Sequence, residues 1–358
     1  MTNNIAQKSI EQSWQPFTLV DAYEDRPPIE YLAGDIFEIP SLNVVYGAPG
    51  SLKSFLLADL AVCVASGNAW LTPYVDGSHY GFPVTQGPVV WLDFDNGKQR
   101  THNRFSALGK ARNLPHNTPL FYYSMPEPIL DAGHEKQVQE VAKIIKKHNG
   151  SLVIIDNLGM ISGGADENSC SMIPVLSNLR GLVETTGTVV IVIHHRRKST
   201  NRNIRQGDDL RGHSSIESAL DLVLLIDRKK QSNTISIQST KERGTDIPAF
   251  SAIFTYKMVG YKQLKEAQFY SVENDRDAET ALLLRVIYES AGEDPINKTS
   301  LSKKVYLGLK NQSKSNHIGM NRVGEKIEQM EALGYLIRIP GMKNNAQLFT
   351  RNPEKAPN

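Results

Sequence analysis

The chain has 358 residues, and its 40 lysines and arginines against 38 aspartates and glutamates leave a formal net charge of +2. This balance excludes a protein coated with positive charge throughout, so any nucleic-acid contact must come from local basic patches. The sequence has no secretion signal at its start and no long apolar run, and Cys63 and Cys170 are spaced neither for a disulfide framework nor for zinc, which favours a cytoplasmic protein without a membrane span.

Residues 1–30 are predicted to form an N-terminal arm. They are polar, contain several prolines and carry only isolated apolar anchors such as Trp14 and Phe17. Such an arm either packs on its own domain or docks on a neighbouring subunit, and the residues leave both possibilities open.

A phosphate-binding loop is predicted where an apolar run beginning at Leu42 breaks into a glycine-containing turn and then continues as a helix. Glycines let successive backbone N–H groups turn inward, and the N-terminus of the helix adds partial positive charge. This pattern predicts ATP and Mg²⁺ as cofactors, with Lys53 on the β- and γ-phosphates and the Ser54 hydroxyl on Mg²⁺. Because Leu52 stands where the pattern usually has a second glycine, an ordinary strand-to-helix turn remains the alternative. The nucleotide-binding residues of this prediction are Gly47, Ala48, Pro49, Gly50, Ser51, Leu52, Lys53 and Ser54.

Strand and helix patterns alternate after this loop, which predicts an α/β fold with a mostly parallel sheet flanked by helices. Asp156 ends the apolar strand predicted over residues 152–156, at the sheet edge where ligands of open α/β sheets bind. A carboxylate there is typical of an Mg²⁺ ligand, and a turn aspartate that caps the next segment is the alternative. The other strands expected in this part of the chain cover residues 87–95, 120–123 and 188–193, and helices are expected over residues 137–147 and 172–183.

A long basic loop follows the last of these strands. Between residues 196 and 211 it has six lysines and arginines against two aspartates. Such a loop is suited to the phosphate backbone of single-stranded DNA, although a solvated surface loop would have a similar composition. The predicted DNA-binding residues are Arg196, Arg197, Lys198, Arg202, Arg205 and Arg211.

A smaller C-terminal domain is predicted over residues 278–352. After late strands over residues 221–226, 234–237 and 251–256 comes a polar linker at 273–277, then three helices and a β-hairpin, a pattern that resembles a winged helix. Seven lysines and arginines stand against one acidic residue between positions 295 and 326. This charge favours duplex DNA as a second partner, and a protein-contact module is the alternative.

Several motifs in this order resemble the RecA-fold ATPases of the plasmid RepA and DnaB hexameric helicase group, over roughly residues 30–260. They are the phosphate-binding loop, residues 91–97, residues 152–156 with 163–169, His194 and His195, residues 211–215, and residues 241–244. The resemblance implies a RecA-like P-loop ATPase domain over residues 31–272 and a homo-oligomer, most simply a hexamer. It also implies that Asp95, in place of the usual glutamate, orients the attacking water, that His195 senses the γ-phosphate, and that Lys241 and Arg243 reach a neighbour's γ-phosphate. An ordinary exposed Lys/Arg pair is the alternative for the last two.

The function expected from these features is a cytoplasmic, Mg²⁺-dependent, DNA-stimulated ATPase of replicative-helicase type from a mobile element or prophage. The alternative is a DNA-binding ATP switch in regulation or recombination that does not translocate processively. Unwinding of a forked duplex would separate the two.

Overall fold

The computed structural model describes residues 16–73, 81–165, 171–195, 218–230, 232–260, 263–272, 275–312, 320–340 and 347–355. The chain divides into two compact units, Met1–Glu30 and Tyr31–Asn358. In the first unit the short helix α2 (Leu19–Tyr23) follows Thr18, whose backbone N–H and hydroxyl both donate to the carboxylate of Asp21, and none of the helix residues is buried. These contacts fix the start of the helix locally.

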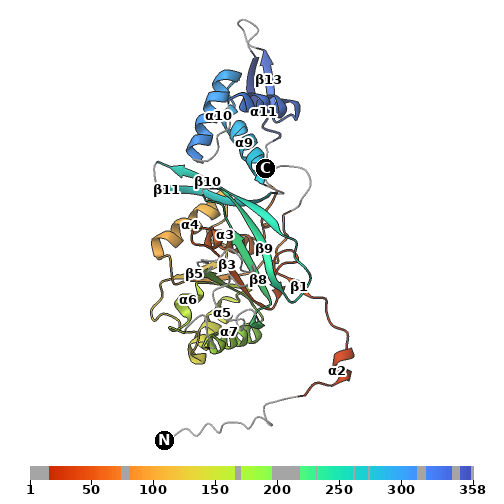
Figure 1. The fold of residues 1–358 in the computed structure, drawn as a ribbon, viewed down its shortest axis with the longest axis vertical. Helices are drawn as coiled ribbons and strands as arrows, with labels where there is room; N and C mark the ends of the chain where they lie inside the picture. The colour runs from red at the N-terminus through yellow and green to blue at the C-terminus, as the bar shows by residue number, and fades with distance from the viewer. Residues whose placement is uncertain are drawn as a thin grey trace, which may run out of the picture. The chain divides into compact units, whose positions relative to one another are not determined.

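The second unit is organised around one sheet, which among the described residues has nine strands in the spatial order β11-β10-β9-β8-β3-β7-β6-β4-β5 (Figure 1). Strands β8, β3, β7, β6, β4 and β5 pair in parallel, and β9, β10 and β11 continue the sheet in antiparallel pairs. The predicted RecA-like P-loop fold class, a mostly parallel sheet flanked by helices, is confirmed. The strands are β3 (Ser41–Gly47), β4 (Val89–Asp93), β5 (Leu120–Ser124), β6 (Leu152–Asp156), β7 (Val189–His195), β8 (Leu222–Asp227), β9 (Thr234–Glu242), β10 (Phe250–Val259) and β11 (Gln263–Val272), preceded by the two short strands β1 (Glu30–Tyr31) and β2 (Glu38–Ile39).

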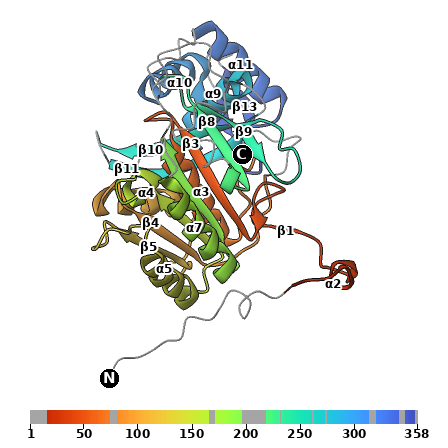
Figure 2. The same ribbon diagram turned by 60° about the horizontal axis from the view of Figure 1, so that its bottom comes forward.

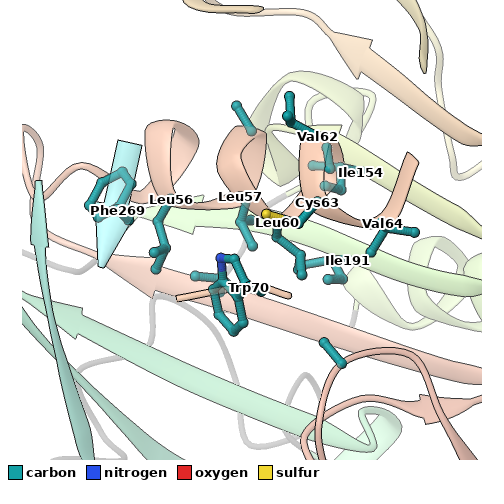
Figure 3. Packing of buried hydrophobic residues seen from close by; sticks show 14 of the residues in the cluster. Leu56, Leu57, Leu60, Val62, Cys63, Val64, Trp70, Ile154, Ile191 and Phe269 are labelled. Atoms are coloured by element: carbon teal, nitrogen blue, oxygen red, sulfur yellow. The ribbon is translucent and has the colours of Figure 1, made fainter. Parts of the chain in front are cut away.

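Helices cover both faces of the parallel strands, because the side chains of a strand alternate between its two faces. Helices α3 (Lys53–Ser66) and α4 (Lys98–Ala111) cover one face, and α5 (Glu135–His148), α6 (Leu158–Ile161) and α7 (Met172–Thr186) cover the other (Figure 1). Figure 3 shows Leu57, Leu60 and the buried Cys63 of α3 directed toward Trp70 and Ile191. Within the described ranges no helix is both long and apolar enough to cross a membrane.

The three late strands β9, β10 and β11 differ from the sequence prediction, and β9 extends beyond the predicted residues 234–237. The strand expected over residues 251–256 is longer, and β11 pairs with it although no strand was predicted there. Only Ala267, Phe269 and Tyr270 of β11 are buried, and charged residues interrupt its first half, so its apolar pattern is too weak to identify from sequence.

The described residues of the C-terminal region form three helices and a small sheet. These are α9 (Asp275–Ala291), β12 (Ile296–Asn297), α10 (Lys298–Gln312), α11 (Met320–Ala332), β13 (Leu336–Pro340) and β14 (Gln347–Arg351), with the strands in the order β12-β14-β13. Figure 2 shows α9, α10, α11 and β13 gathered together. The predicted linker over residues 273–277 is wrong at its end, because α9 already begins at Asp275, and acidic residues are favourable in the first turn of a helix. Ile253 and Tyr270 of the large sheet belong to the same apolar cluster as α9, α10 and α11. The winged-helix assignment stays a prediction.

Candidate active site

The predicted phosphate-binding loop joins the end of β3 to the first turn of α3. A Cβ atom at Gly47 would stand 2.2 Å from the carbonyl oxygen of Ile226 on β8, so only glycine fits at this position. Gly50 has a φ of +78°, a left-handed conformation that residues with side chains rarely adopt. The two glycines therefore allow the tight turn between the strand and the helix.

Leu52 occupies the position where the usual pattern has its second glycine, and its backbone conformation shows how the loop forms without that glycine. Its φ of +69° and ψ of 13° are left-handed, a conformation that costs a non-glycine residue roughly 1–2 kcal/mol. Its side chain is partly buried against the core of the α3 face, and its carbonyl accepts the first helical hydrogen bond, from Leu56 N at 2.9 Å. The loop therefore keeps the glycine-type backbone, and packing of the leucine offsets the strain.

Lys53 begins α3 and is buried inside the loop. Its Nζ donates to the carbonyl oxygens of Gly47 at 2.9 Å and Ala48 at 3.0 Å. Burial lowers the pKa of Lys53 to about 8, although the carboxylates of Asp156 and Asp95 act in the opposite direction. A cation at this position is suited to neutralise phosphate charge in the loop.

Asp156 and Ser54, the two predicted Mg²⁺ ligands, are brought together at the end of β6. Burial raises the pKa of Asp156 to about 6, against the effect of a hydrogen bond from the Ser54 hydroxyl. Mg²⁺ is usually held by one or two protein oxygens together with substrate phosphates, and this hydroxyl and carboxylate fit such a site. In the described part of the chain no three His, Cys, Asp or Glu side chains cluster to hold a metal by themselves.

The two aspartates at and after the end of β4, Asp93 and Asp95, have different environments in the structure. The strand ends at Asp93, two residues before the predicted end, because the carboxylate of Asp93 accepts hydrogen bonds from the backbone N–H groups of Asp95 and Asn96 and turns the chain. The hydroxyls of Thr101 and Ser124 also donate to Asp93, and these bonds outweigh burial and lower its pKa. Asp93 is thus engaged in the fold, whereas Asp95 is exposed and acts on the charges of the buried lysine and aspartate of the site.

His195 ends β7, the strand between β3 and β6. In the parallel register it lies opposite Gly47, the first residue of the phosphate-binding loop. The Nδ2 atom of Asn157 lies 3.5 Å from its Nε2 atom, so the imidazole is also next to the residue that follows Asp156. This position fits the predicted sensor, because it adjoins both halves of the site.

Lys241 and Arg243 lie at the opposite end of the strands from this site. Lys241, in β9, pairs with Val223 near the beginning of β8, whereas the phosphate-binding loop adjoins Ile226 near the end of β8. The two residues are therefore not brought together with the phosphate-binding loop of the same chain.

Arg243 is held at that end by contacts within its own chain. Its Nη1 lies 3.2 Å from Asp221 Oδ1, and its Nη2 donates to the carbonyl oxygen of Ser218 at 2.5 Å. Arg180 binds the same carboxylate with both terminal nitrogens, at 2.6 and 2.9 Å. Half of the Arg243 side chain is nevertheless exposed (49%).

The predicted DNA-binding residues lie outside the described residues, which end at His195 and resume at Ser218. They are Arg196, Arg197, Lys198, Arg202, Arg205 and Arg211. Their DNA contact remains a prediction.

Arg104 of α4 is a residue of the site that sequence reasoning missed. It is 8% exposed, its guanidinium lies 4.6 Å above the ring of Phe55, and its Nη2 donates to Asn96 Oδ1 at 3.3 Å. Within the described residues its Nε and Nη1 have no hydrogen-bond partner. The signal was present in the sequence, since Arg104 falls on the buried face of a helix that has no acidic residue.

Arg228 and Tyr256 flank the outer side of the loop and were also missed. Arg228 Nη1 donates to the carbonyl oxygen of Gly50 at 2.9 Å. From the first turn of α3, Phe55 contacts Phe254 with ring centroids 5.1 Å apart, and Phe254 stacks on Tyr256 at 5.5 Å. Tyr256 is close enough to Arg228 to act on its charge. An aromatic and a cationic side chain thus lie beside the phosphate-binding turn.

Comparison with known proteins gives one family match. A protein-family model described as "AAA domain" matches residues 12–201. No curated protein matches the chain. Among solved structures, the one titled "ATPase Domain of G40P" is 13% identical, with a TM-score of 0.44, and the match covers 60% of this chain and 81% of that one. The one titled "Crystal structure of the RadB recombinase" is 16% identical, with a TM-score of 0.44, and the match covers 61% of this chain and 89% of that one.

Proposed function

The chain belongs to the AAA domain family, and from this membership we propose that it is a Mg²⁺-dependent, DNA-stimulated ATPase of replicative-helicase type that works as a homo-oligomer, most simply a hexamer. ATP hydrolysis would be coupled to the binding or translocation of single-stranded DNA. A DNA-binding ATP switch is the second candidate, and the aspartate at position 95, shorter than the usual glutamate, is the observation that favours it.

One observation carries the ATPase proposal. Lys53, Ser54 and Asp156 meet at the end of the parallel strands, with the exposed carboxylate of Asp95 next to them. These are the groups needed to neutralise phosphates, to hold a cation and to orient water for in-line attack.

Each residue of the site has a distinct role in this proposal. Backbone N–H groups of Ala48, Gly50, Leu52 and Lys53 bind the phosphates, and the Lys53 ammonium neutralises their charge. Ser54 and Asp156 would hold Mg²⁺, which supplies further positive charge to the phosphates when bound. The Asp95 carboxylate orients the attacking water, and His195 transmits the state of the γ-phosphate to the basic loop that begins at residue 196.

The proposal is tested by ATP hydrolysis with and without single-stranded DNA, with molecular mass measured in the same buffer. We expect turnover that requires Mg²⁺, rises with DNA and accompanies an oligomer. Hydrolysis without any response to DNA would contradict the helicase proposal, and strong DNA stimulation without unwinding of a forked duplex would favour the switch.

The nucleobase is proposed to lie on the surface formed by Arg228 and Tyr256. This surface adjoins the predicted phosphate-binding turn, because Arg228 is bonded to the Gly50 carbonyl. Aromatic rings and guanidinium groups both stack on bases.

Tyr256→Ala is expected to weaken ADP binding about tenfold, since stacking of one base contributes roughly 1–3 kcal/mol. Binding of inorganic tripolyphosphate, which has no base, should not change. Tyr256→Phe should retain most of the affinity, and Tyr306→Ala, on the exposed face of α10, is the matched control. Calorimetric titration of each variant with ADP and with tripolyphosphate measures these affinities. Equal losses of affinity for ADP and tripolyphosphate in Tyr256→Ala would place the base elsewhere.

The pH dependence of kcat/KM for ATP is expected to be bell-shaped. Below about pH 6 Asp156 takes up a proton and loses the negative charge that a divalent cation requires. Above about pH 8 Lys53 loses its proton and with it the positive charge that faces the phosphates. Since kcat/KM reports the free enzyme, both limbs should appear in initial rates at ATP concentrations well below KM. A profile that stays level across this range would contradict the assignment of both groups.

A winged-helix domain over residues 278–352 that contacts duplex DNA completes the proposal. Three helices and the strand order β12-β14-β13 support it. The described α11 has Arg322 and Lys326 but also Glu325, Glu328 and Glu331, so contact with a phosphate backbone is favoured only near the beginning of this helix.

A further inference from the structure

The turn after β4 contains a side chain that links the two buried carboxylates of the site. Asp93 and Asp156 end neighbouring strands and lie opposite each other in the parallel register. The Nδ2 atom of Asn96 donates to Asp156 Oδ2 at 2.8 Å and to Asp93 Oδ1 at 3.2 Å. Two like charges at adjacent strand ends repel each other, and this amide places a donor between them.

The orientation of the amide is determined by Arg104. The guanidinium donates to Asn96 Oδ1 at 3.3 Å, so the amide oxygen faces the cation and the amide nitrogen faces the carboxylates. Rotation of the amide by 180° would place its oxygen against two anions and its NH₂ group against a cation. Such an arrangement loses every one of these bonds.

Arg104 is itself fixed against the helix of the phosphate-binding loop. Its guanidinium is buried and lies over the ring of Phe55, the residue after Ser54. A continuous set of contacts therefore runs from the first turn of α3 through Arg104 and Asn96 to Asp156.

We propose that Asn96, oriented by Arg104, is a positioning residue that holds the Asp156 carboxylate in the direction a divalent cation requires. The amide binds Oδ2, which leaves the other carboxylate oxygen of Asp156 for the cation. This inference rests on the proposed function, because it presumes that Asp156 serves a nucleotide-bound cation.

The test measures cation affinity separately from nucleotide affinity. Mn²⁺ is titrated into the full chain with bound ADP and followed by electron paramagnetic resonance, and ADP binding without metal is measured by calorimetry. Asn96→Ala should weaken Mn²⁺ about tenfold, as loss of a hydrogen bond to a metal ligand typically does, and leave metal-free ADP affinity unchanged. Asn103→Ala is the matched control, because this exposed residue of α4 bonds only Gln99 among the described hydrogen bonds.

Arg104→Lys keeps the charge but loses the planar donor, and it provides a second variant. If arginine acts through the amide, Arg104→Lys should weaken Mn²⁺ less than Asn96→Ala does, and the double variant should be no weaker than Asn96→Ala alone. Additive losses, an unchanged Mn²⁺ affinity, or an equal loss of metal-free ADP binding would each overturn the inference while leaving the ATPase proposal in place. A wild-type chain that binds neither ADP nor Mn²⁺–ADP would overturn both.

Discussion

Lys53→Ala is expected to abolish ATP hydrolysis, with a loss of at least about a hundredfold in turnover. The ammonium group is the only positive charge that the structure places inside the phosphate-binding turn among the described residues, and its removal leaves the β- and γ-phosphates without a neutralising cation from the loop. Phosphate release at saturating Mg²⁺–ATP measures the effect.

The fold should survive this change, which makes the result interpretable. The pKa of Lys53 is lowered by burial, so the folded state binds this proton less tightly than the unfolded chain does, and below about pH 8 the charged lysine opposes folding. Lys53→Met, which keeps the apolar stem, should therefore melt at no lower temperature than wild type and should be equally inactive. Turnover at the wild-type rate in either variant would refute the nucleotide site.

Arg243→Ala is expected to reduce hydrolysis by about 10³-fold or more and to change ATP affinity little. Among the described residues only Lys53 places a positive charge inside the loop of one chain, and Arg243 lies at the opposite end of the strands, where we propose that it faces the site of a neighbour. The half-exposed Arg243 side chain would leave its contacts with Asp221 and the Ser218 carbonyl to reach a neighbour.

Arg180→Ala is the matched control for this variant. Arg180 binds the same Asp221 carboxylate, so its loss should cost stability, measured by thermal unfolding, without a comparable loss of hydrolysis. An equal loss of activity in both variants would mean that Arg243 stabilises the fold around Asp221 and does not contact the γ-phosphate of a neighbour.

Mixing protomers decides whether Arg243 acts across a subunit boundary. A heteromer of Lys53→Ala and Arg243→Ala chains contains some sites in which one chain provides an intact loop and its neighbour an intact arginine. Activity should partly return. If mass measurement shows that mixed oligomers form and no activity returns, Arg243 acts within one chain, and the main support for a ring is lost.

Apolar runs were enough to predict most of the parallel sheet and the covering helices α3, α5 and α7, whereas the polar helix α4 was not predicted. Residues 152–156 form β6 as predicted, because a short run of Val, Ile and Leu that ends in an aspartate has few alternatives in an α/β chain. By contrast, β11 and the first turn of α9 were missed. Both are partly polar segments whose state depends on pairing with β10 or on packing in the C-terminal cluster, and neither partner is visible in local sequence.

The sequence by itself determined the glycine-containing turn after β3 and the aspartate at the end of β6, since glycine conformation and strand ends are local properties. Only the tertiary structure decided that Asp93 is saturated with hydrogen bonds while Asp95 is exposed, because the donors to Asp93 come from α4 and β5. It also decided that Arg104 reaches the site and that Arg243 does not. Both outcomes depend on which ends of the strands lie together in the sheet, and long-range strand pairing determines this arrangement.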